Sequence, residues 1–153
     1  MTDRAGRLGM LAGFGYRGFI RELRAALCRQ GYDDLGGAYE AVFRALCDEP
    51  LPLVHLAARL GMTAQGAAKI VDEMEARAYV ERRPDPADGR IKQLHLGKRG
   101  RAAFNAGRRF SAAYEKRLAA RLGEADLKAA RRVLEAMAAA GANESGGERL
   151  PRL

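Results

Sequence analysis

The sequence predicts a mainly helical protein with six helices and one β-hairpin. Apolar residues recur at helical steps of three and four along most of the chain, and this pattern breaks only once. The break is the stretch ERRPDPADGRIKQLHL, residues 81–96, in which two prolines and an Asp-Gly pair separate two runs that can pair as strands. With 153 residues, the chain is long enough to bury the core of one domain.

The first two helices are predicted at residues 8–30 and at about 38–47. Apolar residues at helical intervals mark the first one: Phe14, Phe19, Leu23 and Leu27. Three glycines weaken its first half by about 1 kcal/mol each relative to alanine, so this helix needs packing, and a second chain is one source of it. The second helix has its apolar face at Tyr39, Val42, Phe43 and Leu46.

The next two helices are predicted at residues 53–60 and from Thr63 to about residue 78. The shorter one buries Leu53, Leu56, Ala57 and Leu60, and Gly61 closes it. Thr63 is a good N-cap for the longer one, because its hydroxyl can bond a free amide of the first turn. The apolar stripe of the longer helix is Ala67, Ile70, Val71, Met74 and Ala78. A short helix, a tight turn and a second helix with a polar outer face make a helix-turn-helix.

The hairpin follows this helix, with strands predicted at residues 79–83 and 91–96. Two alternate residues of the second strand share one face: Leu94 and Leu96. The last two helices are predicted at residues 98–122 and at about 124–140. Residues 142–153 are expected to form a mobile tail.

Positive charge is concentrated from the hairpin onward. The net charge is +8, to which residues 1–81 contribute −1, residues 82–101 +5 and residues 102–153 +4. Residues 82–101 reach +5 because they hold seven basic and two acidic side chains. A focused positive patch favours a polyanionic partner, whereas the plainer interpretation is a basic, solvated surface.

Composition argues against several other classes of protein. No run of 18 apolar residues exists, and the N-terminal segment lacks the hydrophobic core of a signal peptide, so we expect a cytoplasmic protein without a membrane partner. Two cysteines and two histidines at these spacings cannot assemble a usual zinc site. No nucleophile lies beside a histidine in a recognisable motif, and no glycine-rich loop follows a strand. We therefore expect no enzymatic activity, cofactor or metal.

The helix that begins after Thr63 is the candidate DNA-recognition helix. A helix-turn-helix lays its second helix in the major groove, where residues near the N-terminus of that helix reach base edges. The candidate recognition residues are Thr63, Ala64, Gln65, Gly66 and Lys69. Glutamine can pair with adenine and lysine with guanine, whereas threonine can bond a phosphate or touch a thymine methyl group. The two small residues permit close approach.

The hairpin is a candidate wing beside that helix. Its tip would present Arg90 to the narrow minor groove, where the negative potential is strongest. A carboxylate facing DNA is repelled, so we expect Asp88 to fix the loop through its own backbone or an arginine. The candidate wing residues are Arg83, Asp88, Arg90 and Lys92.

Residues 51–101 carry a set of spaced motifs in these elements. They are Leu56-Ala57 in the third helix, Val71, Asp72 and Met74-Glu75 in the fourth, Arg83 at the entry to the wing, and Asp88 and Arg90 at its tip. The set resembles the multiple-antibiotic-resistance regulator (MarR) family of winged-helix repressors. Three positions depart from the family pattern: Ala78 stands in place of a glycine, Gly89 in place of the commonest middle residue of the wing tip, and Gly97 in place of a threonine that caps the next helix.

The resemblance implies a winged helix-turn-helix fold in a domain-interlocked homodimer. Residues 1–37 and 98–141 would form the helical dimerisation region, and residues 38–97 the DNA-binding region. Two symmetric readers would bind a pseudo-palindromic operator in double-stranded DNA, with half-sites about 34 Å apart. The implied function is that of a sequence-specific transcriptional repressor, released by a small aromatic or phenolic ligand. The candidate ligand pocket consists of Phe14, Tyr16, Tyr39 and Phe43.

Other interpretations remain open at this point. The charge alone also fits a non-specific nucleic-acid or chromosome-binding protein, and a winged helix can serve protein contacts instead. Cys28 or Cys47 could make a thiol redox-sensing regulator of the same fold, although packing is the plainer role because nothing local activates either thiol. Core packing is likewise the plainer role for the four aromatic residues of the candidate pocket.

Overall fold

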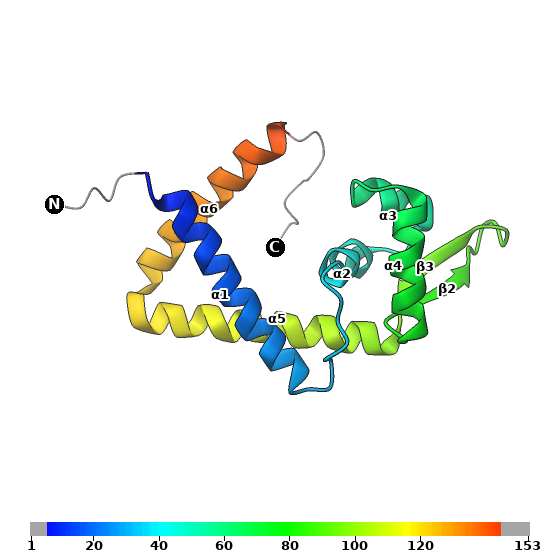
Figure 1. Ribbon diagram of the computed structural model, residues 1–153, viewed down its shortest axis with the longest axis horizontal. Coiled ribbons are helices and arrows are strands. Elements are labelled where there is room, and N and C mark those ends of the chain that lie inside the picture. The colour runs from blue at the N-terminus through cyan, green and yellow to red at the C-terminus, as the bar shows by residue number, and fades with distance from the viewer. Residues whose placement is uncertain (1–5, 145–153) are drawn as a thin grey trace. The chain divides into compact units, whose positions relative to one another are not determined.

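The computed structural model describes residues 6–144, in which six helices and three short strands follow one another (Figure 1). The mainly helical winged-helix fold predicted from the sequence is confirmed. The tail expected at residues 142–153 is helical as far as Glu144, and its remainder lies outside the described residues. The elements are α1 (Leu8–Cys28), α2 (Tyr39–Asp48), β1 (Leu51–Pro52), α3 (Leu53–Arg59), α4 (Ala64–Ala76), β2 (Val80–Pro84), β3 (Lys92–Leu96), α5 (Lys98–Leu122) and α6 (Glu124–Glu144).

The chain divides into two compact units, each of which is described by itself. The helical unit comprises the residues up to Asp34 together with Gly107–Met137. Among the described residues, the wing unit comprises Leu35–Ala106 and residues 138–144. The division therefore falls inside α5, whose first turns belong to the wing unit. Within residues 6–144, no helix combines the length and apolarity needed to cross a membrane.

The wing is an antiparallel sheet with strand order β1-β3-β2. β2 and β3 form the predicted hairpin, in which Val80 pairs with Leu96 and Arg82 with Leu94. β1 was not predicted, because a strand of two residues carries no alternation to detect. It adds to the outer side of β3 by pairing Leu51 with Leu94.

The core of the wing unit lies between the sheet and helices α2, α3 and α4. Its largest fully buried side chains come from these elements and from the turn between α4 and β2, which holds Tyr79: Tyr79, Leu56, Met74, Leu94, Val42, Val71 and Val80. Leu94 and Leu96 are both buried, which confirms the predicted inner face of the second strand. A fully buried aliphatic side chain stabilises a fold by roughly 1.5–3 kcal/mol, so this cluster fixes α4 against the sheet.

α4 ends with an unusual backbone conformation. The Tyr79 N–H donates to the Met74 carbonyl at 2.8 Å and the Ala78 N–H donates to the Glu75 carbonyl at 2.9 Å, the bonding pattern of a Schellman cap. Ala78 has φ +61°, a left-handed value that favours glycine. The predicted apolar stripe of α4 was therefore wrong at Ala78, which is exposed and lies beyond the helix.

We predict that Ala78→Gly stabilises the protein by about 1 kcal/mol, because glycine adopts a positive φ without the Cβ clash. Gly61 provides the matched control, since it closes α3 with φ +63° and a Cβ there would meet nothing within 4 Å. Gly61→Ala should lose about the same amount that Ala78→Gly gains. Urea unfolding followed by circular dichroism measures the stability of both variants. A lower urea midpoint for Ala78→Gly than for the parent protein would contradict the positive φ assigned to Ala78.

The start of α5 packs directly against the backbone that follows α4. The Gly97 N–H donates to the Tyr79 carbonyl at 2.9 Å. A Cβ on Gly97 would lie 2.7 Å from the Ala78 carbonyl oxygen, and one on Gly100 would lie 2.0 Å from the Tyr79 carbonyl oxygen. Both positions therefore require glycine, and Gly97 cannot be exchanged for the family's threonine without a backbone shift here.

The helical unit is held by aromatic contacts between α1 and α5. The ring of Phe19 lies 5.8 Å from that of Phe110 and 5.2 Å from that of Tyr114, measured between centroids. An ion pair of 3.0 Å joins Arg117 to Glu22. α1 and α6 nevertheless leave many large apolar side chains exposed: Leu8, Met10, Leu11, Phe14, Tyr16, Val133, Leu134 and Met137.

Candidate nucleic-acid interface

α4 begins at Thr63, as the sequence predicted. The Thr63 Oγ1 accepts a hydrogen bond from the Gly66 N–H at 3.1 Å, which is the expected N-cap. The hydroxyl hydrogen of Thr63 can still be donated to a phosphate oxygen. A Cβ on Gly66 would lie 3.2 Å from that Oγ1, so glycine lets the first turn close tightly around its cap.

The five predicted recognition residues lie together on the outer side of the first two turns of α4. Each of them is exposed: Thr63, Ala64, Gln65, Gly66 and Lys69. The opposite side of the helix packs in the core of the wing unit through three fully buried residues: Ala67, Val71 and Met74. The arrangement thus presents short and polar side chains to a partner from a fixed helix, while their contact with DNA stays a prediction.

The wing tip is organised by Asp85, a residue that the sequence did not single out. The Asp85 Oδ1 accepts from the Ala87 N–H at 2.7 Å and from the Asp88 N–H at 3.1 Å. Its Oδ2 accepts from the Gln93 side-chain amide. These bonds, from Ala87 first, lower the pKa of the Asp85 carboxyl below its ordinary value. The only sequence feature that pointed to this role was the Pro-Asp pair at the strand end, which favours a turn.

Asp88 and Arg90 occupy the far end of the same loop. The Asp88 Oδ1 accepts from the Arg90 backbone N–H at 3.0 Å, and the Ile91 N–H donates to the Asp88 carbonyl at 2.9 Å. Asp88 therefore fixes the loop as expected, because its carboxylate and its carbonyl both accept backbone N–H groups of the loop. The side chain of Arg90 is exposed and makes no ion pair among residues 6–140.

We predict that the order of the wing tip depends on pH through Asp85. A carboxyl whose pKa is lowered on folding contributes stability above its ordinary pKa, and this contribution disappears as the pH falls through the lowered value. The amide resonance of Ala87, followed by NMR during an acid titration, should change with a midpoint below the ordinary aspartate value of 3.8. Asp85→Asn should remove this transition; a midpoint at or above 3.8 in the parent protein would contradict it.

Arg82 joins the wing to the recognition helix. Its Nη2 lies 2.6 Å from the Asp72 Oδ1, its Nη1 bonds the Glu75 carboxylate, and its backbone N–H donates to Glu75 at 3.3 Å. The Arg82 side chain is only 28% exposed. Partial burial lowers the pKa of Arg82, but Asp72 and Glu75 outweigh it and raise that pKa overall. From the sequence, Arg82 was only one of the basic residues of the positive patch. An ion pair between residues ten positions apart on two different elements leaves no local sequence pattern that would predict it.

Ion pairs and stacking engage three of the seven basic residues in the patch at 82–101. Arg82 is bound to α4, and Arg83 pairs with Glu81 on the same strand. The Arg99 guanidinium lies 4.4 Å from the Tyr79 ring centroid and donates to the Arg77 carbonyl at 3.1 Å. Four cations make no ion pair within the described part of the chain: Arg90, Lys92, Lys98 and Arg101.

The four aromatic residues of the candidate ligand pocket are divided between the two units, two in each. Phe14 and Tyr16 are exposed on α1, in the helical unit. Tyr39 and Phe43 are buried in the wing unit, where each ring lies 5.8 Å from that of Tyr79. The two buried residues therefore have a packing role, and the pocket stays a prediction. Of the two cysteines, Cys28 is exposed, and the Cys47 thiol donates to the Arg44 carbonyl at 3.1 Å.

Residues 34–91, which contain α2, the helix-turn-helix and most of the wing, match the model of the MarR family. This segment is similar to the MarR family. The resemblance seen in the spaced motifs is thereby confirmed for this segment. No curated protein matches the chain.

Solved structures share the fold over most of this chain. RV1404 from Mycobacterium tuberculosis is 19% identical with a TM-score of 0.76, over 97% of this chain and 98% of the other. FabT from Streptococcus pneumoniae, solved in complex with DNA, is 18% identical with a TM-score of 0.70, over 84% and 90%. The protein SP03579, a MarR family transcription regulator, is 23% identical with a TM-score of 0.65, over 89% and 91%. At these identities the similarity establishes the fold.

Proposed function

We propose that this chain is a sequence-specific DNA-binding transcriptional regulator that acts as a repressor. The observation that carries the proposal is the juxtaposition of an exposed, polar first turn of α4 with a wing whose tip presents Arg90. A winged helix-turn-helix uses these two elements to read adjacent grooves of DNA. FabT is described in complex with DNA and CouR as a transcriptional repressor bound to a 23-mer DNA duplex, which supports the same partner here.

The exposed residues of the recognition helix α4 and of the wing each have a chemical role in this proposal. Gln65 and Lys69 lie one turn apart and would reach base edges in the major groove, where they favour adenine and guanine respectively. Thr63, at the helix N-terminus, would donate to a phosphate. Arg90 would enter the minor groove, with Arg83 and Lys92 beside it on the strands.

The proposed active species is a homodimer. Large apolar side chains on α1 and α6 are exposed in the single chain, and α6 buries none of its residues completely among those described. Exposed apolar surface of this kind marks an interface. Residues 1–37 and 98–141 would form it, and a two-fold axis would place two copies of the reader, residues 38–97, on a pseudo-palindromic operator. Sedimentation at micromolar concentration should show a dimer.

Release by a small aromatic or phenolic ligand is the proposed mode of regulation. A ligand that binds better to a form unable to span both half-sites would shift the population away from DNA. The protein would act in the cytoplasm, where the operator is. The charged wing also fits a non-specific nucleic-acid-binding protein, which the experiment below separates from the proposal by comparing DNA sequences.

We predict that Arg90→Ala weakens operator binding by about 1–3 kcal/mol, roughly 5- to 150-fold, because the wing loses its minor-groove contact. Fluorescence anisotropy would measure this on a duplex selected from a random-sequence pool. The control is Arg44→Ala, which removes the same charge from an exposed ion pair on α2 and should change affinity little.

Two outcomes would contradict the proposal in different ways. Equal affinity for the selected duplex and for random duplexes at matched salt would indicate a non-specific binder. Unchanged affinity of Arg90→Ala would mean that the wing does not contact DNA and would favour a winged helix that serves protein contacts.

A further inference from the structure

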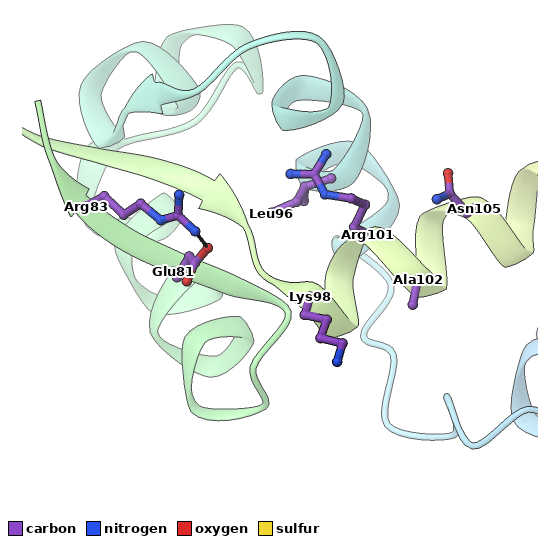
Figure 2. Close-up of a pocket in the computed structure, with 7 residues that line it drawn as sticks. All are labelled: Glu81, Arg83, Leu96, Lys98, Arg101, Ala102 and Asn105. Atoms are coloured by element: carbon purple, nitrogen blue, oxygen red, sulfur yellow. Dashed lines mark hydrogen bonds and ion pairs between the residues drawn. The ribbon is translucent and has the colours of Figure 1, made fainter. Parts of the chain in front are cut away.

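A hollow of about 520 Å³ lies in the wing unit, between β2 and the first turns of α5. Its polar lining comprises Glu81, Arg83, Lys98, Arg101 and Asn105. Figure 2 shows Glu81 and Arg83 on β2, with the Arg83 guanidinium paired to the Glu81 carboxylate, and shows Lys98, Arg101 and Asn105 on the first turns of α5. Apart from Arg83, none of the residues proposed to read DNA lines this hollow.

The hollow carries an excess of positive charge. Three cations and one carboxylate make a formal charge of +2, and the carboxylate, that of Glu81, already pairs with Arg83. Lys98 and Arg101 make no ion pair with any residue that the structure describes. The charge within the hollow is therefore uncompensated by the protein itself.

The N-terminus of α5 adds to this positive potential. α5 is 25 residues long and begins at Lys98, with no acidic residue in its first turn. The residue before it, Gly97, has no side chain that could cap the free amides. Basic residues at the positive end of a helix are unfavourable, and an anion bound there relieves the repulsion.

We propose that this hollow binds a small organic dianion, specifically a phosphate monoester. A phosphoryl group would balance the formal charge of +2, and arginine together with a helix N-terminus is a favourable setting for phosphate. The apolar part of the lining comes from Leu96, which is 4% exposed, and from Ala102. The exposed methyl group of Ala102 suits a compact apolar body on the ester, and the Asn105 amide offers a hydrogen bond to it.

Occupancy of the hollow would also affect the wing, a consequence that rests on the proposed function. Arg83 belongs both to the hollow and to the proposed wing contacts. A bound dianion would attract its guanidinium and cancel positive potential beside the DNA. Operator binding should therefore weaken several-fold in the presence of the ester at constant ionic strength.

The experiment is calorimetric titration of the full chain with phenyl phosphate at pH 8 and low salt, where the ester is a dianion because its second pKa is about 6. We expect saturable binding with a Kd of about 1 mM or tighter, and binding of benzoate, which carries the same ring and one charge, at least about tenfold weaker. Arg101→Gln should weaken phenyl phosphate binding about tenfold, and Glu81→Gln should strengthen it. Arg108→Gln removes a charge from α5 outside the hollow and should change nothing.

Melting curves of each variant show that it is folded before it is titrated. Opposite effects of Arg101→Gln and Glu81→Gln distinguish a binding role from a structural one, because damage to the fold would weaken binding in both. The absence of saturable binding, equal affinity for benzoate, or equal effects of Arg101→Gln and Arg108→Gln would overturn the proposal. So would a loss of DNA affinity in Arg101→Gln together with no phenyl phosphate binding, since the hollow would then be a DNA contact.

The proposed effect of the ester on DNA binding can fail while the proposed binding site in the hollow still stands. Saturable phenyl phosphate binding that leaves operator affinity unchanged supports the site and refutes its link to the wing. A protein that prefers no DNA sequence refutes the proposed function, whereas the calorimetric result for the hollow still stands.

Discussion

Replacing Gly100 by alanine is expected to prevent the wing unit from folding. A Cβ at this position would lie 2.0 Å from the Tyr79 carbonyl oxygen and 2.9 Å from its carbon. Both are backbone atoms, and the same oxygen accepts the Gly97 N–H at 2.9 Å, while the Tyr79 side chain is fully buried. No side-chain rotation relieves the contact, so the cost should exceed about 4 kcal/mol, a large share of the stability of a typical domain.

Gly107→Ala is the matched control on the same helix. Its Cβ would meet only Leu23 Cδ1 at 4.0 Å, an ordinary van der Waals distance. The change should stabilise α5 by up to about 1 kcal/mol, because alanine has the higher helix propensity. Soluble yield and thermal melting by circular dichroism measure both variants. If Gly100→Ala melted within a few degrees of the parent protein, the close packing of α5 on Tyr79 would be wrong.

The second large effect is expected at Arg82. Its guanidinium neutralises Asp72 and Glu75 on the recognition helix. In Arg82→Gln, both carboxylates would stand unneutralised on the helix that is proposed to meet a polyanion. We expect DNA affinity to fall by about 10- to 100-fold, and the protein to lose about 1–2 kcal/mol of stability because the partly buried link between β2 and α4 breaks.

The test is a rescue in the same protein. Adding Asp72→Asn and Glu75→Gln to Arg82→Gln removes the exposed carboxylates and should restore most of the DNA affinity, measured by anisotropy at constant salt. Arg83→Gln serves as the comparison for stability, because Arg83 is 59% exposed and pairs only with Glu81 among the described residues, so its melting temperature should hardly change. Failure of the rescue would mean that Arg82 contacts DNA itself.

The parts of the fold that the sequence predicted are those with a local pattern. Helical periodicity located α5 from Lys98 to Leu122, and the Pro-Asp and Asp-Gly steps located the hairpin to within a residue at its strands. The threonine before α4 predicted its cap correctly, because the bond to Gly66 spans only three residues. These features depend on neighbours in the chain.

The features that the sequence did not predict depend on contacts between distant elements. β1 is defined by its partner strand, since two residues cannot show a period of two. The ion pairs of Arg82 join β2 to α4, and a count of charges cannot separate such an internal pair from a cation available to a ligand. The stripe on α4 was extended to Ala78 because alanine fits a helix, whereas the cap placed it at a positive φ.

The internal ion pairs of the wing have a consequence for its response to ionic strength. Affinity for DNA falls with salt in proportion to the number of phosphates that a protein neutralises, because each contact releases condensed counterions. Three of the seven cations at residues 82–101 are bound to groups of the protein. The salt dependence of binding should therefore correspond to fewer than the seven cations of this segment in each chain, so that affinity persists better at high salt than the net charge of +8 suggests.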